Sequence, residues 1–363
     1  MKRRPKHERL YSTLAAKIRS GTMKPGAKLP SQRALMKEYR VSLATVSAAF
    51  GALAREGLID TFHGRGTFVA ETAMRPPRDD SRATLGLFLP RMTGNPAGVL
   101  KGVYDASHDL GARLEFLIFD GGVERARRCA EVVDGAVAVD GCLVMHVEGY
   151  QDVIAALRRA RFPYVVMDTP RRYDAMNQVV LDHERAAADA VRHLADHGHR
   201  RVALVTGPLG ARDARNEWAH AKLAGWRAAV AERGLARHRS LRAELPDLSP
   251  ESAKAAARSL VANADFSALF VAAGSVATDV IDGLREAGHD VPGDVAVTSF
   301  NVNEYGAMCL DEYAVSGMDV PRVGCGRAAV ELLVQIVSGG AARAQRVAEL
   351  PIPFVRRRSC GCA

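Results

Sequence analysis

Short apolar runs alternate with longer amphipathic stretches from Thr84 onward, and this rhythm restricts the possible folds more than any other feature of the chain. Most of the runs are continuously apolar, which is typical of strands that are buried on both faces. Strands that alternate with helices form parallel sheets covered by helices on both sides. The expected strands are 85–89, 114–119, 141–146, 164–167, 202–206, 268–272 and 295–299.

The expected strands form two series, which are separated near residue 180. Two series predict an α/β structure of two doubly wound parallel-sheet lobes, roughly 84–180 and 181–300, with the C-terminal segment crossing between them. Ligands of such sheets bind beyond the carboxyl ends of the strands. We therefore expect the region 84–363 to bind a ligand in the cleft between its lobes.

The first 70 residues have a different pattern, which predicts three short helices and a β-hairpin. Leu10, Leu14 and Ile18 give the first helix an apolar stripe. Ser31 and Ser42 are expected N-caps, because a serine hydroxyl accepts a hydrogen bond from the first turn of a helix. The inward positions of the second and third helices are Leu35, Tyr39, Val46, Ala49 and Leu53. The hairpin strands are expected at 58–62 and 67–69, joined by the glycine-rich turn 63–66.

Residues 71–83 separate these two regions. They contain two prolines and charges of both signs, and they have no apolar period. Such a composition is typical of a linker. The sequence thus predicts a small domain at 1–70, a linker at 71–83 and a large domain at 84–363.

The positive charge of the chain is concentrated in its first fifth. Residues 1–70 hold 14 Lys and Arg against 4 Asp and Glu, whereas the remaining residues hold 36 against 37. A basic region in an otherwise balanced chain indicates a polyanionic partner for that region. The alternative is a basic tail that only improves solubility.

Cysteines and apolar segments bear on cofactors and location. The six cysteines, Cys129, Cys142, Cys309, Cys325, Cys360 and Cys362, include no pair of CxxC units. The terminal Cys-Gly-Cys could bind a metal or form a strained disulfide, but we expect no metal site and no cofactor. No apolar signal region follows Met1, and no apolar stretch is long enough to span a membrane. These features predict a cytoplasmic protein.

The spacing of the second and third helices predicts a helix-turn-helix with its bend at Arg40-Val41. In this motif the first turn of the second helix of the pair meets base edges in the major groove. The candidate contacts in that turn are Ser42, Leu43, Ala44, Thr45 and Ser47. The hydroxyl groups and the helix N-terminus also favour phosphate.

Four ordered blocks resemble the DNA-binding domain of the GntR family. They are LPSQR at 29–33, VSLATV at 41–46, LAREGLI at 53–59 and HGRGTFV at 63–69. The resemblance implies that Arg33 contacts DNA and that His63, Gly64 and Arg65 form a wing that reaches the minor groove. The alternative for Arg33 is a surface ion pair with Glu38. Leu43 and Ser47 stand where the family often has arginine, so fewer charged base contacts are implied.

The large domain resembles the LacI-type sensory domain, which has the fold of periplasmic sugar-binding proteins. The resemblance depends on GHRRVALVTG at 198–207, KLAGW at 222–226, VPGDVAV at 291–297 and LPIPFVRRRS at 350–359. It implies a GntR–LacI chimeric repressor of the arabinose-repressor type, which senses a sugar. For Trp226 within the second block, core packing is favoured over a role in stacking on a ligand.

The expected effector site departs from the family pattern. Lys222 replaces the ligand-contacting arginine, Ala273-Gly274 replaces an Asn-Asp pair, and Asn301 replaces an acidic residue. Further candidates are Arg91, His146 and Ser275, although a solvated surface role is an alternative for Arg91 and His146. A cation kept at Lys222 and an amide in place of a carboxylate at Asn301 favour a polar effector such as a sugar, a sugar acid or a sugar phosphate.

Other functions fit the sequence less well. An enzyme is disfavoured, because the chain has no nucleophile elbow, P-loop or GxGxxG after a strand. A transport receptor would need a signal peptide and no basic domain. A sensor-like domain that serves only as a dimerisation scaffold stays open. We expect a homodimer on a double-stranded, pseudo-palindromic DNA operator, because a two-fold dimer recognises two half-sites.

Overall fold

Two separate units make up the structure, a computed structural model. It describes residues 5–19, 22–24, 26–55, 58–62, 66–70, 82–90, 97–145, 150–210, 216–303, 311–338 and 345–362. The units are Met1–Ser81 and Arg82–Ala363. Each unit has its own hydrophobic core, so each is described by itself.

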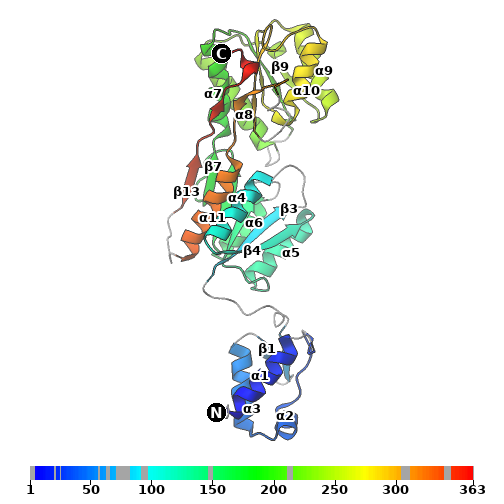
Figure 1. Cartoon of the computed structure of the whole chain (residues 1–363), viewed down its shortest axis with the longest axis vertical. Helices are drawn as coiled ribbons and strands as arrows, with labels where there is room; N and C mark the ends of the chain where they lie inside the picture. Colours follow the sequence, from blue (N-terminus) through cyan, green and yellow to red (C-terminus); the bar gives the residue numbers. More distant parts are fainter. Residues whose placement is uncertain are drawn as a thin grey trace. The chain divides into compact units, whose positions relative to one another are not determined.

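Three helices and a hairpin form the N-terminal unit (Figure 1). They are α1 (Lys6–Arg19), α2 (Gln32–Tyr39), α3 (Leu43–Arg55), β1 (Ile59–Phe62) and β2 (Gly66–Val69). The two strands pair in an antiparallel arrangement that places Ile59 opposite Val69. The three helices and the hairpin predicted from the sequence are confirmed for the described residues.

The apolar stripes of this unit meet in one core. Its buried side chains include Leu10, Leu14, Ile18, Leu35, Val46, Ala49 and Leu53. The amide N–H of Ala34 donates to Ser31 Oγ at 3.2 Å, and that of Thr45 donates to Ser42 Oγ at 3.3 Å. Both predicted N-caps are therefore present. Arg40 has a φ of 50°, a left-handed conformation that ends α2 and turns the chain towards α3.

The second unit contains two six-stranded sheets, one in each lobe. The first lobe has the order β13-β7-β6-β5-β3-β4. Its strands are β3 (Thr84–Pro90), β4 (Arg113–Phe119), β5 (Gly141–Met145), β6 (Tyr164–Thr169), β7 (Gln178–Leu181) and β13 (Val347–Leu350). Its helices are α4 (Ala97–Asp109), α5 (Gly121–Val133), α6 (Tyr150–Arg159) and α11 (Arg322–Ser338).

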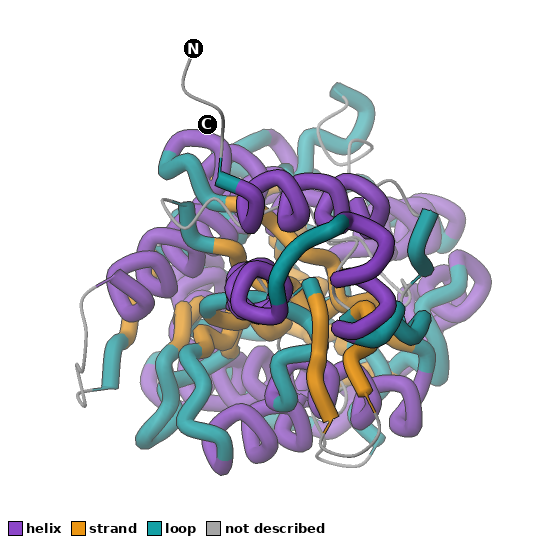
Figure 2. Tube along the Cα trace, turned by 90° about the horizontal axis from the view of Figure 1, so that it is seen from below, coloured by secondary structure: helices purple, strands orange, loops and turns teal. Residues whose placement is uncertain are grey.

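The second lobe has the order β14-β12-β11-β10-β8-β9. Its strands are β8 (Val202–Thr206), β9 (Arg242–Glu244), β10 (Ala268–Val271), β11 (Ala296–Phe300), β12 (Ser316–Met318) and β14 (Phe354–Val355). Its main helices are α7 (His183–Asp196), α8 (Glu217–Glu232), α9 (Pro250–Asn263) and α10 (Ala277–Glu286). Among the described strand pairs of the two sheets, only β12–β14 is antiparallel. Helices lie on both sides of the sheets (Figure 2). The two parallel-sheet lobes predicted from the sequence are confirmed.

The C-terminal part of the chain passes from one lobe to the other and back. After β12 in the second lobe, α11 packs against α4 and β13 pairs with β7 in the first lobe (Figure 1). β14 then returns to the second lobe and pairs with β12. A Cβ atom at Gly102 or Gly326 would lie about 2 Å from a backbone oxygen of the other helix, so α4 and α11 pack backbone to backbone.

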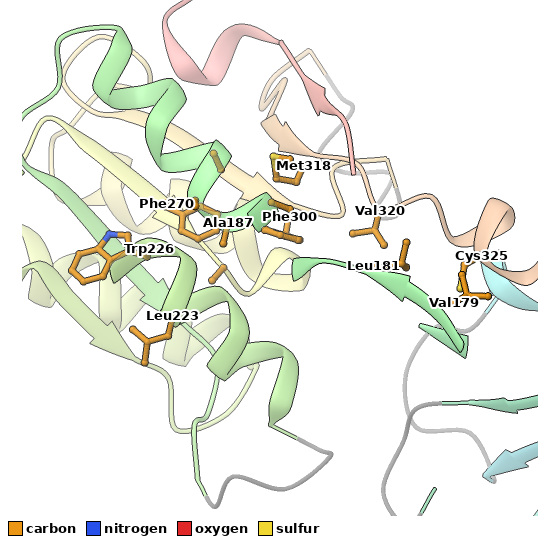
Figure 3. Packing of buried hydrophobic residues seen from close by; sticks show 14 of the residues in the cluster. Val179, Leu181, Ala187, Leu223, Trp226, Phe270, Phe300, Met318, Val320 and Cys325 are labelled. Atoms are coloured by element: carbon orange, nitrogen blue, oxygen red, sulfur yellow. The ribbon is translucent and has the colours of Figure 1, made fainter. Parts of the chain in front are cut away.

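One hydrophobic cluster continues through both lobes. It extends from Trp226 in the second lobe past Phe300 and Val320 to Cys325 in α11 (Figure 3). Trp226 is 6% exposed, and its indole N–H donates to the backbone oxygen of Val202 at 3.2 Å. The sequence interpretation of Trp226 as a core residue is thus confirmed. Among the described helices, none is long and apolar enough to cross a bilayer.

Candidate functional site

The first turn of α3, residues 42–47 (hereafter the α3 turn), presents small side chains on the surface of the N-terminal unit. The exposed side chains of this turn are Ser42, Leu43, Ala44 and Ser47. Thr45 is half-buried, with Oγ1 2.9 Å from Ser42 Oγ, and Val46 points into the core. Leu43 is a large apolar side chain that is 51% exposed. A helix N-terminus with small exposed side chains allows close approach of a polyanion.

Arg33 lies in the first turn of α2 and is exposed. Glu38, the acid considered as its ion-pair partner, is also exposed, and no ion pair joins these two described residues. Lys37 and Arg40 add exposed positive charge on the same short segment. The guanidinium group of Arg33 is therefore available for a ligand outside the unit.

The hairpin after α3 is the predicted wing. Phe62 and Phe68 contact each other edge to face at 5.8 Å, and Lys28 Nζ lies 5.7 Å from the Phe68 ring. The first contact joins the two strands to each other, and the second joins β2 to the segment between α1 and α2. The predicted tip residues, His63, Gly64 and Arg65, lie outside the described residues.

In the second unit, charged and aromatic side chains meet at the carboxyl ends of β6 and β11. We call this group the cleft cluster; it comprises Asp168, His183, Lys222, Phe300, Asn301 and Arg322. Asp168 is held by an ion pair in which Arg322 Nη1 lies 2.9 Å from Oδ2. Asp168 and Arg322 come from elements of the first lobe, and the other members come from elements of the second. The cluster therefore joins the two lobes, at the strand ends where ligands of such sheets bind.

The Phe300 ring is contacted by two nitrogen-bearing side chains. His183 stacks on it with ring centroids 5.6 Å apart, and Lys222 Nζ lies 4.6 Å from its centroid. Lys222 Nζ also donates to the backbone oxygen of Ala272 at 3.0 Å. A cation over an aromatic face is stabilised by the ring quadrupole, so the structure holds the ammonium group at this end of the sheet.

His183 is buried in the neutral form. Burial lowers its pKa most strongly, the nearby charges of Lys222 and Arg322 lower it further, and Asp168 opposes them. Its Nε2 atom lies 3.6 Å from Asp168 Oδ1, which is beyond hydrogen-bond distance, and neither ring nitrogen has a hydrogen-bond partner among the described residues. A buried imidazole without partners is uncommon and marks a place where a polar ligand group could satisfy it.

Asn301 and Ser275 are the other described candidates from the sequence, and their surroundings differ. Asn301 is 7% exposed, has a φ of 56°, and its Oδ1 has no hydrogen-bond partner among the described residues. Ser275 is exposed in a short 3-10 turn. The preceding Gly274 packs against the Phe300 backbone so closely that a Cβ atom would lie 2.0 Å from its oxygen. No side chain fits at Gly274 without a shift of the backbone.

A cavity of about 440 Å³ opens between the lobes beside α6 and α8. On its wall, Glu217 of α8 accepts a hydrogen bond from the Tyr173 hydroxyl and one at 3.3 Å from Arg171 Nε. Tyr150 and His220 also line it. A hollow of about 610 Å³ between α5 and α6 lies on the outer face of the first lobe, and no residue of the second lobe or of the cleft cluster lines it. The cavity between the lobes is therefore the more relevant one for a ligand.

Only part of this site was predictable from the sequence. Lys222, which contacts Phe300, and the next residue, Asn301, were predicted, whereas Asp168, His183 and Arg322 were not. Asp168 directly follows the apolar run 164–167, so its position at a strand end was a usable signal. The candidates Arg91 and His146 lie outside the described residues.

The fold and these two surfaces define a class of protein: a two-lobed ligand-binding domain attached to a small helix-turn-helix domain. Residues 6–69 match bacterial regulatory proteins of the gntR family, and residues 191–360 match the periplasmic binding protein-like domain. The chain thus combines a region similar to the gntR-family domain with a region similar to the periplasmic binding protein-like domain.

Known regulators resemble this chain at moderate identity. Catabolite control protein A of Priestia megaterium is 26% identical over 201 residues, which cover 55% of this chain and 58% of that protein. The arabinose metabolism transcriptional repressor of Geobacillus stearothermophilus is 24% identical over 205 residues, which cover 55% of this chain and 56% of that protein. The chain therefore matches little more than half the length of each relative. The solved structure of the transcriptional regulator CelR in complex with cellobiose has a TM-score of 0.63 at 23% identity, covering 88% of this chain and 92% of that chain, and it shares the fold.

Proposed function

We propose that this protein is a transcription repressor that binds DNA through its N-terminal unit and responds to a small polar metabolite bound between the two lobes. The observation that carries the proposal is the exposed α3 turn on a unit whose positive charges greatly outnumber its negative ones. A protein with this function would act in the cytoplasm, where it meets DNA.

The DNA contacts that we propose come from three places in the N-terminal unit. The α3 turn enters the major groove, and Arg33 contacts a base or phosphate beside it. The wing tip, with His63, Gly64 and Arg65, reaches the adjacent minor groove. Exposure of the α3 turn and of Arg33 supports this arrangement, as does the match to the gntR family.

The cleft cluster favours an effector rich in hydroxyl groups, with or without a negative charge. Lys222 and Arg322 supply positive charge, neutral His183 can donate and accept, and the Asn301 amide can do both. Asp168, the carboxylate of the cluster, is engaged by Arg322. We infer that a sugar acid or a sugar phosphate suits the site better than a neutral sugar, with Ser275, Arg91 and His146 as further contacts.

The effector would act by changing the balance between arrangements of the lobes. Glu217 with Tyr173 and Arg171 is one set of contacts between them that a ligand could strengthen or break. We further propose a homodimer on a pseudo-palindromic operator, with residues 71–83 linking the domain 1–70 to the domain 84–363.

The function can be tested with purified full-length protein in two stages. Footprinting on genomic fragments should show protection of two half-sites, and protection of one half-site by a monomer would refute the proposed dimer. A panel of neutral sugars, sugar acids and sugar phosphates should then contain a compound that raises the melting temperature and changes DNA affinity. A ligand at 100 times its dissociation constant stabilises the folded state by about 2.7 kcal/mol, enough to be measured.

The matched variants for the second stage are Lys222→Met and Lys254→Met. Both remove one ammonium group, but Lys254 of α9 forms an ion pair with Glu286 outside the cleft cluster. The effector response should be lost only in Lys222→Met. If only neutral pentoses or hexoses act, the preference for anions is wrong. If no compound acts and Lys222→Met regulates normally in cells, the sensor domain serves as a dimerisation scaffold instead.

A further inference from the structure

Two histidines and a cysteine meet at the end of α7 that lies farthest from the cleft cluster. His193 and His197 are one helical turn apart, and their ring centroids are 4.4 Å apart. The chain end brings Cys362 to this place, with Sγ 3.1 Å from His193 Nε2 (Figure 1). One ligand atom from each of the three residues lies within 4.8 Å of the others.

The donor atoms of this group are oriented for binding an ion. The His197 Nδ1 atom lies 2.7 Å from the backbone oxygen of His193, so Nδ1 carries the proton and donates it. This tautomer leaves the Nε2 lone pair of His197 free, and hydrogen bonds of this kind orient histidine ligands in metal sites. His193 is held in place by Phe354, whose ring centroid is 4.2 Å away.

A second thiol is close to the three residues. Cys360 is 2% exposed, it is not in a disulfide, and its backbone oxygen lies 3.4 Å from Cys362 Sγ. Between the thiols, Gly361 has a φ of 69°, a left-handed turn that folds the chain back. The site thus offers two imidazoles and two thiols.

The backbone that carries the thiols is anchored in the second lobe. Ser359 Oγ donates to the Val297 backbone oxygen at 2.7 Å and accepts from the Ser316 amide at 2.8 Å. The Ser359 amide donates to the Ala314 backbone oxygen at 3.0 Å. These bonds attach the segment to β11 and β12, so a ligand would meet a largely preorganised group.

We propose that His193, His197 and Cys362, with Cys360 as the fourth donor, form a binding site for a divalent ion of the zinc type. Nitrogen and sulfur donors select Zn²⁺ over Mg²⁺ and Ca²⁺, which prefer oxygen. Ligand atoms around a tetrahedral zinc ion are about 3.5 Å apart, so side-chain adjustments of about 1 Å complete the site. The ion would link the end of α7 to the C-terminal segment.

The site is distinct from the proposed effector site. His183, at the start of α7, belongs to the cleft cluster, and the 14 residues of the helix place its other end about 20 Å away. We expected no metal site from the sequence because it contains no pair of CxxC units, and the 169 residues between His193 and Cys362 hide their proximity. A CxC motif without nearby histidines in the chain is a weak signal.

The test uses full-length protein that has been reduced and freed of metal with a chelator. Titration with Co²⁺ should produce the visible absorption of a tetrahedral ion and a thiolate charge-transfer band, with about one ion per chain. Zn²⁺ should then displace Co²⁺ and raise the melting temperature. Competition with a chromophoric chelator measures the affinity for Zn²⁺.

Three variants make the test specific. His197→Ala and Cys362→Ser should each weaken Zn²⁺ binding by more than the roughly 10- to 100-fold that loss of an outer-shell partner costs. His197 is exposed and Cys362 is only half-buried, so both variants should fold. His199→Ala is the matched control. Nδ1 of His199 lies 2.9 Å from Ser267 Oγ, so this ring is engaged elsewhere and its removal should leave the affinity for Zn²⁺ unchanged.

Three results would overturn the proposal. The first is that the reduced protein fails to take up Co²⁺, and the second is that the bound Co²⁺ lacks the thiolate band. The third is that His199→Ala weakens binding as much as His197→Ala. A protein that passes the DNA and effector tests but gives any of these results would have the proposed function without the metal site.

Discussion

The α3 turn of the N-terminal unit and the cleft cluster of the second unit are built in opposite ways. The exposed side chains of the α3 turn come from one helix, and the cap from Ser42 is a local hydrogen bond. The cleft cluster gathers side chains from both lobes, and its central ion pair joins Asp168 to Arg322 across 154 residues of chain.

This difference separates recognition from stability in the two units. Exposed side chains of the α3 turn contact little of their own unit, so substitutions there should change what the protein binds and leave its folding intact. Members of the cleft cluster hold elements of both lobes together, so substitutions there should change stability as well as binding. Each of the following predictions tests one side of this comparison.

We expect the largest effect on stability from removing the charge of Asp168. Asp168→Asn keeps the size of the side chain and tolerates the left-handed φ of 61°, but removes the carboxylate charge that pairs with the largely buried Arg322 guanidinium. The free energy of unfolding of the second unit should fall by about 3 kcal/mol. Denaturant titration followed by tryptophan fluorescence measures this, because both tryptophans lie in that unit.

Lys254→Ala is the control for Asp168→Asn, because it breaks the exposed ion pair with Glu286. Its effect should be below about 1 kcal/mol. Equal losses in the two variants would show that the cleft cluster contributes no more to stability than a surface ion pair does.

Arg33→Ala tests the opposite side of the comparison. It should weaken operator binding by about 2 kcal/mol, roughly 30-fold, and relax the preference at one base pair while thermal unfolding stays unchanged. Lys37→Ala on the same helix is the control, and as a phosphate contact it should weaken all sequences alike. If Arg33→Ala also weakens binding to all sequences alike, and DNA affinity then depends less on salt concentration, Arg33 contacts a phosphate.

Ser42→Ala is the exception expected within the α3 turn. Removing the hydroxyl that accepts from the Thr45 amide should destabilise the N-terminal unit by about 1 kcal/mol. Hydrogen exchange of the α3 amides measures the effect. Ser47→Ala should change exchange by less than about 0.5 kcal/mol, and an equal effect of both variants would contradict the capping role.

The smallest effect concerns pH. Because burial lowers the pKa of His183 in the folded state, the unfolded chain binds more protons, and stability is lost as the pH falls below the unfolded pKa of about 6.5. At pH 6 this loss is at most about 0.8 kcal/mol. His183→Gln should flatten the dependence of the unfolding free energy on pH between pH 7 and 6. If the pH dependence of stability persists in His183→Gln, groups other than His183 cause it.

Most of the regular structure was predictable because its signals are local. The stripe of Leu10, Leu14 and Ile18 and the caps at Ser31 and Ser42 lie within a few residues of the groups they contact. Continuous apolar runs marked the central strands of both sheets, because a buried strand must be apolar on both faces. Shorter strands such as β9 and β12 were missed, since three residues cannot display a period.

By itself, the sequence determined the order of the helices and the longer strands, the basic N-terminal unit and the α3 turn, because periodicity, caps and charge depend on neighbours along the chain. Only the tertiary structure decided that Asp168 meets Arg322 and that Cys362 meets His193. Those partners lie more than 150 residues apart, on elements whose pairing depends on the return of the chain through α11, β13 and β14. Contacts of this kind form only when both lobes have packed, because no local interaction brings the partners together.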